Sequence, residues 1–541
     1  MSASSKKKLR NAEQAEKMTE KQLAEQKEAK QLKLYSTLAV VILVVLVVFA
    51  AYVGISRTIA NSGIRERSTV ALTVGEHEIS NAELNYYYID VVNQFYSQNG
   101  SYASIFGLDL TQPLDEQVLS EETGETWADY FLQSAIENVK ATYALVDEAN
   151  ANGYTLPEDA VANIDNAMEY MELYASVYGY TDTKTYLKAM YGKGATEKGL
   201  REYYEMTELA SNYQSYYQES LTYTDADLRA KEAEDYNAYS SYNYNYYYLN
   251  ANNFIESEDD STDYTDEQKA AGVAAAEEAA KTLTDGITTV EAFDAAIAAL
   301  PINAESTTAA SYSSTDVSYS SIPSAFADWV TDASRKEGDM TYVANTSTKT
   351  DDDGNEVEQI SGYYVVLFGS CNDNTYPLAN VRHILVAFEG GTYDSTTGTT
   401  TYSDEEKAAA WEEAEAILNE WKSGDATEDS FAALANEKSA DSDGTDGGLY
   451  EDIYPGQMVE AFEDWCFGGH VPGDTGIVET EYGCHVMYYS GDSETTYRDY
   501  LIRNDLVSAA YEEWYTALVE AVTVTENNFK YISTDLVLSA S

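Results

Sequence analysis

Four short segments, in this order, determine the fold of the C-terminal half of the chain: NVRHILV at 380–386, GGL at 447–449, GQMVEAF at 456–462 and YGCHV at 482–486. The first and the last are rich in β-branched and apolar residues, which is typical of buried strands. Between them, Ser403-Asp-Glu-Glu406 has the form of a capping box and predicts the start of a helix. The stretch therefore predicts a compact α+β domain that begins and ends on a strand.

Two of the chain's four histidines lie on the outer segments of this stretch, His383 on the first and His485 on the last. Met458 and Phe462 are four residues apart, a spacing that would place both on one face of a single helix. By spacing alone, such a pair belongs more often to a core than to a pocket, and a single strand histidine is more often structural than catalytic. The residues by themselves leave both interpretations open.

Taken together and in this order, the four segments resemble the parvulin-type peptidyl-prolyl isomerases, and the resemblance implies such a domain over residues 373–492. Two of only four histidines fall at the two family positions, which favours a site over a structural role. The resemblance implies that the catalytic residues are His383, Asp441 and His485, and that the substrate-binding residues are Leu449, Met458, Phe462 and Thr480. Tyr482 departs from the pattern, because a smaller residue is common there.

The implied reaction has simple chemical requirements. Rotation about an X–Pro bond has a barrier of ~18–20 kcal/mol, because twisting the amide sacrifices its resonance. No bond breaks, so the reaction needs no nucleophile, and we expect no metal and no cofactor. A pocket that holds the proline ring and favours the twisted amide raises the rate tenfold for each ~1.36 kcal/mol. We therefore assign the two histidines and Asp441 an orienting and electrostatic role, not proton transfer.

Length, charge and hydropathy predict the number of domains, the kind of partner and the cellular location. At 541 residues, and roughly 150 residues per domain, three or four domains are expected. The net charge of −61 repels phosphate backbones and disfavours a nucleic-acid partner. The segment 34–56 is almost purely apolar and long enough to span a membrane as one helix. Residues 1–33 carry nine Lys/Arg and five Glu, so the positive-inside rule predicts a basic cytoplasmic tail and an extracytoplasmic bulk.

A cleaved signal peptide is the alternative to this single-pass anchor, since Val48-Phe49-Ala50 resembles a cleavage site. The apolar run is longer than the 7–15 residues usual in the apolar region of a signal peptide, which favours the anchor. We therefore expect a cell-membrane protein attached by one N-terminal helix.

An internal repeat indicates that the α+β domain occurs twice. The run YTDEQKAA at 264–271 recurs as YSDEEKAA at 402–409, and AFADW at 325–329 recurs as AFEDW at 461–465. We call residues 224–370 the first repeat and residues 373–492 the second repeat. In the first repeat Tyr364 replaces His485, and either Asn245 or Tyr246 replaces His383. The sequence therefore predicts a degenerate, inactive parvulin-like domain that serves as a peptide-binding module or a spacer.

Residues 68–222 read as a mainly helical domain that begins with the hairpin-like VALTVGEHEI at 70–79. This segment resembles the N-terminal chaperone domain of SurA- and PrsA-like foldases. The resemblance implies that residues 493–541, a helix followed by a strand, pack back on that domain. The fold class is thus α+β multidomain: a transmembrane helix, a chaperone domain, two parvulin-like domains and a returning C-terminal helix.

The expected function is a membrane-anchored isomerase and chaperone for exported proteins. Its partners would be unfolded or partly folded exported chains with X–Pro bonds, and the oligomeric state is left open. Two alternatives remain at this stage: a non-catalytic holdase chaperone, and a cell-surface binding protein that uses parvulin-like domains as peptide-binding modules.

Overall fold

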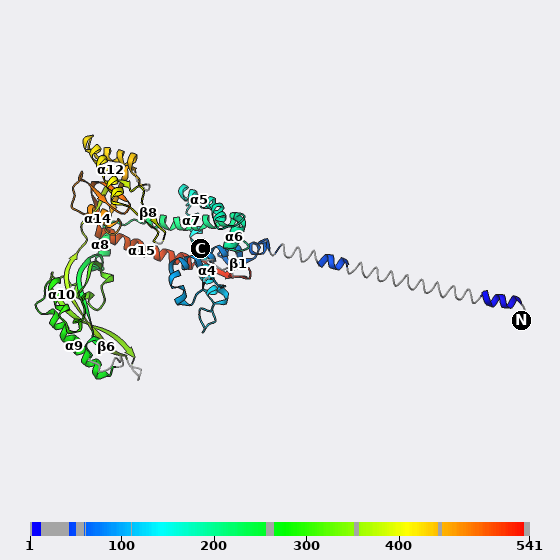
Figure 1. Ribbon diagram of the computed structural model, residues 1–541, viewed down its shortest axis with the longest axis horizontal. Helices are drawn as coiled ribbons and strands as arrows, with labels where there is room; N and C mark the ends of the chain where they lie inside the picture. The colour runs from blue at the N-terminus through cyan, green and yellow to red at the C-terminus, as the bar shows by residue number, and fades with distance from the viewer. Residues whose placement is uncertain are drawn as a thin grey trace. The chain divides into compact units, whose positions relative to one another are not determined.

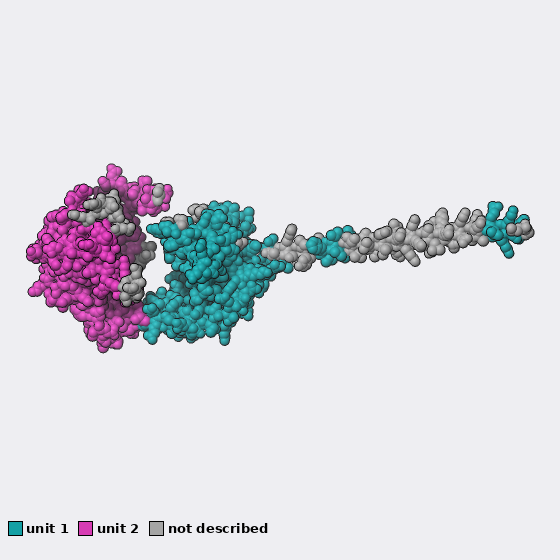
Figure 2. Space-filling view, turned by 90° about the horizontal axis from the view of Figure 1, so that it is seen from below, with its two compact units in different colours: residues 1–221, 510–541 teal, residues 222–509 magenta. Residues whose placement is uncertain are grey.

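The computed structural model describes residues 3–11, 43–49, 59, 61–109, 111–255, 264–350, 356–395, 397–441 and 446–534. The chain forms two compact units, residues 1–221 with 510–541 (unit 1) and residues 222–509 (unit 2), coloured teal and magenta in Figure 2. Of the predicted membrane span 34–56, only 43–49 is described, as an exposed helical piece, and the rest lies outside the described residues. Within the described ranges, no helix combines the length and apolar character needed to cross a membrane.

Unit 1 contains the predicted hairpin, formed by β1 (Val70–Val74) and β2 (His77–Ser80). A third strand, β13 (Val524–Glu526), pairs antiparallel with β1 and closes a three-stranded sheet in the order β13-β1-β2. The hydroxyl of Ser80 accepts a hydrogen bond from the Glu83 amide and starts α3 (Asn81–Asn99), as expected for an N-cap. The C-terminal strand thus belongs to the same sheet as the first strand.

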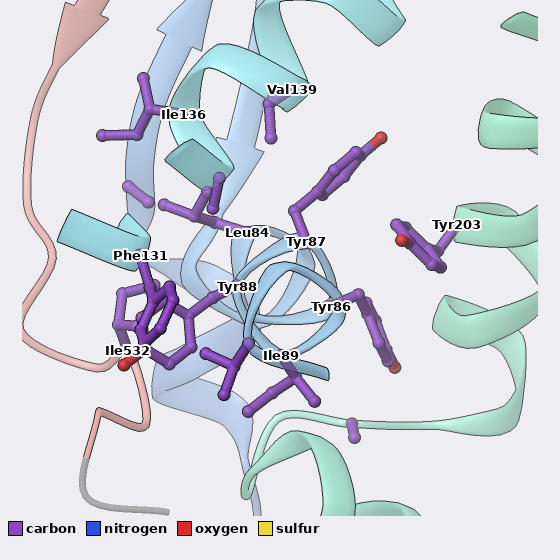
Figure 3. Close-up of a cluster of buried hydrophobic side chains, with 14 of the residues drawn as sticks. Leu84, Tyr86, Tyr87, Tyr88, Ile89, Phe131, Ile136, Val139, Tyr203 and Ile532 are labelled. Atoms are coloured by element: carbon purple, nitrogen blue, oxygen red, sulfur yellow. The ribbon is translucent and has the colours of Figure 1, made fainter. Parts of the chain in front are cut away.

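The rest of unit 1 is helical, and its core forms around α3. Other helices of the unit include α2 (Ile64–Ser68), α4 (Trp127–Ala151), α5 (Glu158–Val177), α6 (Thr183–Tyr191), α7 (Glu197–Ser220) and the end of α15 (Tyr497–Glu520), with the short 3₁₀ helices η1 (Gly100–Phe106) and η2 (Leu114–Glu116). Figure 3 shows Leu84, Tyr88 and Ile89 of α3 in this core, near Phe131 of α4. Tyr86 of α3 points instead toward Tyr203 of α7, and the two rings stack at 5.6 Å.

Unit 2 contains two four-stranded antiparallel sheets of the same order. In the first repeat, β3 (Ser241–Asn250), β4 (Tyr312–Ser318), β5 (Met340–Thr350) and β6 (Glu356–Asn372) are arranged β4-β3-β6-β5. In the second repeat, β7 (Pro377–Ala387), β10 (Leu449–Ile453), β11 (Thr475–Glu479) and β12 (Gly483–Thr496) are arranged β10-β7-β12-β11. Each strand of one sheet has a counterpart at the same place in the other, which agrees with the internal repeat.

Two helices cover one face of each sheet. In the first repeat these are α9 (Asp266–Thr284) and α10 (Val290–Ala298), labelled beside β6 in Figure 1. In the second they are α12 (Asp404–Ser423) and α13 (Glu428–Lys438). The predicted capping box at Ser403 forms at the start of α12, and Thr265 forms the same box with Gln268 at the start of α9.

Short helices cover the opposite faces: α11 (Ala327–Val330) in the first repeat and α14 (Glu460–Cys466) in the second. The remaining elements of unit 2 are α8 (Asp225–Glu232), the start of α15 (Tyr497–Glu520), the β8–β9 hairpin (Thr392–Asp394 and Thr399–Thr401) and the 3₁₀ helices η3 to η7. The face that carries α14 also carries the predicted site, because His383 and His485 alternate with the residues that pack on α12 and α13.

Candidate active site

The two predicted histidines meet on adjacent central strands of the second repeat. In the β7–β12 ladder His383 pairs with Met487 and Leu385 pairs with His485, so the imidazoles lie diagonally across the two strands on one face. Their Nδ1 atoms are 3.0 Å apart and both side chains are buried, with 4% and 5% of their surface exposed. Two rings that the sequence separates widely therefore form one hydrogen-bonded pair.

A carboxylate and a hydroxyl extend this pair at its two ends. Asp441 Oδ2 lies 2.9 Å from His383 Nε2, and Thr480 Oγ1 lies 2.8 Å from His485 Nε2. The loop that carries Asp441 is held on β7, since the Leu385 amide donates to Ser439 Oγ and the Ala440 amide donates to the Leu385 carbonyl oxygen. The structure thus brings together the three predicted catalytic residues and Thr480.

The partners determine which ring nitrogen carries each proton. The Asp441 carboxylate accepts, so His383 donates from Nε2 and, as a neutral ring, has a free lone pair on Nδ1. His485 then donates from Nδ1 and accepts at Nε2 from the Thr480 hydroxyl. That hydroxyl also accepts a hydrogen bond from the Tyr482 amide, which directs its own proton toward His485. The whole chain is satisfied with both imidazoles neutral.

The electrostatics of the site favour the same protonation. Burial lowers the pKa of His383, although the neighbouring Asp441 carboxylate opposes that shift. Burial lowers the pKa of His485 to about 4, and the adjacent His383 acts in the same direction. Near neutral pH both rings are therefore uncharged, and the site presents fixed dipoles beside one carboxylate.

An apolar wall stands against the two imidazoles. The ring of Phe462 meets His383 and His485 nearly edge-on, with centroids 5.4 and 5.3 Å apart and interplanar angles of 86° and 84°. Met458 packs in the same apolar cluster as Phe462. Leu449 begins β10 and pairs with Arg382, next to His383 on β7. Tyr482, the departure from the family pattern, is 60% exposed and so does not fill this site.

The prediction that Met458 and Phe462 share one helix is wrong. Helix α14 starts at Glu460, and Val459 is its N-cap with the extended dihedral angles φ −63° and ψ 145°. Met458 therefore lies in the chain that enters the helix. It still contacts the cluster around Phe462, because the extended N-cap turns the entering chain across the same side of the sheet.

Tyr450 belongs to the site and was missed from the sequence, and Gly448 of the Gly-Gly-Leu motif lets Tyr450 reach it. The hydroxyl of Tyr450 donates to Asp441 Oδ2 at 2.8 Å, and its ring lies 5.1 Å from that of His383. Gly448 has φ +65°, and a Cβ atom there would come within 2.3 Å of the His383 carbonyl oxygen. Glycine therefore allows β10 to approach β7 closely enough for Tyr450 to reach Asp441. The sequence signal for Tyr450 was its position as an aromatic residue directly after the motif Gly-Gly-Leu.

Over the described residues, no group of three or more His, Cys, Asp or Glu side chains is arranged to hold a metal ion. The side chains that converge in the second repeat are suited to hold a neutral, partly apolar group against a hydrogen-bonded floor.

Comparison with known proteins places this site in a family. Residues 370–490 match the family model of the PPIC-type PPIASE domain, and this range contains all seven predicted site residues. The segment is a parvulin-type peptidyl-prolyl isomerase domain, as the sequence motifs indicated. No curated protein matches the sequence.

Three solved structures are similar to parts of the chain. Peptidylprolyl isomerase PrsA from Bacillus anthracis is 20% identical with a TM-score of 0.17, and the match covers 28% of this chain and 59% of that one. PrsA from Bacillus cereus is 23% identical with a TM-score of 0.17, covering 30% and 58%. PrsA from Bacillus subtilis is 15% identical with a TM-score of 0.27, covering 73% and 88%. The chain thus spans less than two thirds of the first two structures, and at these identities the likeness alone assigns no function.

Proposed function

We propose that the chain is a peptidyl-prolyl cis/trans isomerase and chaperone that assists the folding of exported proteins at the outer face of the cytoplasmic membrane. The observation that carries this proposal is the continuous hydrogen-bonded chain from Tyr450 through Asp441, His383 and His485 to Thr480, backed by Phe462, within the PPIC-type domain. The isomerase activity is proposed for the second repeat.

The site can lower the rotation barrier without covalent chemistry. Resonance gives the planar amide a larger dipole than the twisted amide, so removing water destabilises the planar form more. Met458 and Phe462 supply an apolar surface on which a proline ring would pack, and the buried imidazoles limit the water beside it. Because both rings are neutral, they offer oriented dipoles and no mobile charge, and these can hold the carbonyl end while the bond turns.

We call the series of hydrogen bonds from Tyr450 through Asp441, His383 and His485 to Thr480 the polar chain, and this role requires it to be rigid. Each hydrogen-bond donor in it points at an acceptor, so moving one member leaves a buried group unsatisfied. The site is therefore preorganised before a peptide arrives. We assign His383, Asp441 and His485 to orientation and electrostatics, Leu449, Met458 and Phe462 to the proline ring, and Thr480 to holding His485.

A holding function is proposed for unit 1. A cavity of about 820 Å³ lies between α3, α4 and α7, with Tyr86, Tyr143, Met206 and Leu209 among its lining residues. Charged residues also line it, namely Arg67, Glu83, Lys198, Glu202 and Glu205. Its size and this mixed apolar, hydroxyl and charged lining suit side chains of an extended peptide. This cavity also favours the second candidate function, a non-catalytic holdase that keeps the second repeat only as a binding module.

The location is proposed from the sequence. The apolar segment 34–56, the basic tail 1–33 and the acidic remainder support one membrane-spanning helix with an extracytoplasmic bulk. Protease treatment of intact cells should then leave only the tail and the membrane-spanning segment protected. Protection of the repeats would contradict the proposed location.

Refolding of a substrate protein limited by prolyl isomerisation separates the two candidate functions. The full chain should accelerate the slow refolding phase, and Asp441→Ala should remove most of that acceleration while aggregation of the substrate is still suppressed. A purely non-catalytic holdase would suppress aggregation equally in both proteins and would leave the slow phase unchanged.

A further inference from the structure

The strand register of the first repeat shows what replaced the two histidines. In the second repeat Met487 pairs with His383, and His485 lies two residues before Met487. In the first repeat Val366 pairs with Tyr246, and Tyr364 lies two residues before Val366. Tyr364 therefore occupies the place of His485. Tyr246 occupies the place of His383, which settles the alternative between Tyr246 and Asn245.

The apolar wall of the site persists in the first repeat. Phe326 is buried, and its ring centroid is 5.8 Å from that of Tyr246 and 5.4 Å from that of Tyr364. Phe462 makes the corresponding contacts with the two imidazoles at similar distances. Ile322 is buried in the same cluster, four residues before Phe326, as Met458 precedes Phe462. Three aromatic rings thus occupy corresponding places in both repeats, although their interplanar angles differ.

The polar chain does not persist. Among the described residues, no hydrogen bond joins the Tyr246 or Tyr364 hydroxyl to a carboxylate or an imidazole, and the two ring centroids are 6.0 Å apart. Phenol rings in place of paired imidazoles cannot reproduce the fixed sequence of donors and acceptors of the second repeat. The first repeat keeps the surface that would hold a ring and loses the groups that would act on the amide.

This surface is open. Tyr246 and Tyr364 are half-buried and Tyr312, whose ring centroid is 5.2 Å from that of Tyr246, is 64% exposed. Tyr248 continues the row, with its ring centroid 4.8 Å from that of Tyr364. We call Tyr246, Tyr248, Tyr312 and Tyr364 the aromatic surface; the rings of Tyr246 and Tyr364 pack on the buried Phe326. Flat, rigid rings in a row are the lining on which extended proline-containing segments dock with little entropic cost.

We propose that the aromatic surface of the first repeat binds a proline-containing extended segment of a client chain without catalysing its isomerisation. The inference rests on the proposed function, because it takes the equivalent surface of the second repeat to be a proline-ring site. A client with two prolines could then occupy both repeats of unit 2. Binding at the first would raise the local concentration of the other proline at the catalytic repeat.

Photo-crosslinking on the full chain tests the inference. The probe is an alanine-rich peptide with p-benzoylphenylalanine directly before one proline, and the competitors are the unlabelled proline peptide and the same peptide with alanine for proline. Cross-links should map to residues 241–250, 312–318 or 356–372 as well as to the second repeat. The proline peptide should compete them away at concentrations where the alanine peptide does not.

Two variants test the aromatic surface, and a third variant is the control. Tyr246→Leu with Tyr364→Leu keeps apolar volume and should reduce first-repeat cross-links about tenfold. Tyr312→Ser should also reduce the first-repeat cross-links, and because Tyr312 is exposed this reduction does not arise from misfolding. Tyr102→Ser is the control: Tyr102 is 59% exposed in unit 1, and its substitution should leave the cross-links unchanged.

The isomerase rate on a single-proline peptide is measured on the same preparations and should be equal in all of them. Wild-type protein without proline-competed cross-links in the first repeat would overturn the inference, whether or not the second repeat is active. An inactive second repeat with such cross-links intact would contradict only the proposed isomerase.

Discussion

Acidification should destabilise the second repeat through His485. Burial holds the pKa of this imidazole at about 4 in the folded chain, against an ordinary value of 6.5. Between these values the unfolded chain binds a proton that the folded site excludes. The free energy of unfolding therefore falls as the pH drops through 6.5, and the loss is complete near pH 4.

The size of this loss in the free energy of unfolding follows from the difference between the pKa values of His485 in the unfolded and folded chain. A difference of 6.5 − 4 at ~1.36 kcal/mol per pH unit amounts to about 3 kcal/mol. Acidification also neutralises part of the large negative charge of the chain, which acts in the opposite direction. The contribution of the imidazole must therefore be taken as a difference from a variant that lacks it.

Urea unfolding from pH 7.5 to 4.5, for the wild type and for His485→Asn, measures this difference. Trp421 packs on Tyr488 in the core of the second repeat and contributes to the fluorescence signal. The stability advantage of the wild type should shrink by about 2.5 kcal/mol by pH 4.5, because this range covers most of the interval between the two pKa values. Equal pH dependence in the two proteins would refute the buried neutral pair.

Three further predictions concern single side chains. Tyr450→Phe should lower kcat about fivefold with little change in KM, because it removes a hydrogen bond worth about 1 kcal/mol from the polar chain; Tyr482→Phe is the matched control, and an equal fall in both would contradict this. Gly448→Ala should destabilise the second repeat by more than about 2 kcal/mol in thermal unfolding, since φ is +65° and the new Cβ meets a carbonyl oxygen; an unchanged melting temperature would contradict it. Arg498→Leu should cost about 3 kcal/mol, because it removes a buried guanidinium that pairs with Glu232 and donates to the carbonyl oxygens of Asp373 and Tyr236, although Glu232 keeps its pair with Arg229; an unchanged free energy of unfolding would contradict this explanation.

The sequence predicted the members of the polar chain that stand in a motif. His383 and His485 lie in the strand motifs, and the resemblance to the parvulin family implied Asp441 and Thr480. Tyr450 could not be found in this way, since its contact depends on where the loop before Asp441 lies against β7. Loop position is a tertiary property that no local pattern encodes.

Two other features of the structure could not be predicted from the sequence, each for a local physical reason. The i, i+4 spacing of Met458 and Phe462 does not reveal that Val459 is an extended N-cap, so the helix was predicted to start too early. The repeat offset alone could not choose between Asn245 and Tyr246, because a one-residue slip in a strand turns a side chain to the opposite face. Only the ladder pairing of Tyr246 with Val366 decides it.

Exchange NMR on a short X–Pro peptide, with the full chain at catalytic concentration, tests the central claim most directly. The wild type should bring cis and trans peptide resonances into rapid exchange, and the Asp441→Ala and Phe462→Leu variants, if folded, should each lose most of that effect. Wild-type protein that binds the peptide but leaves its exchange at the uncatalysed rate would contradict the account.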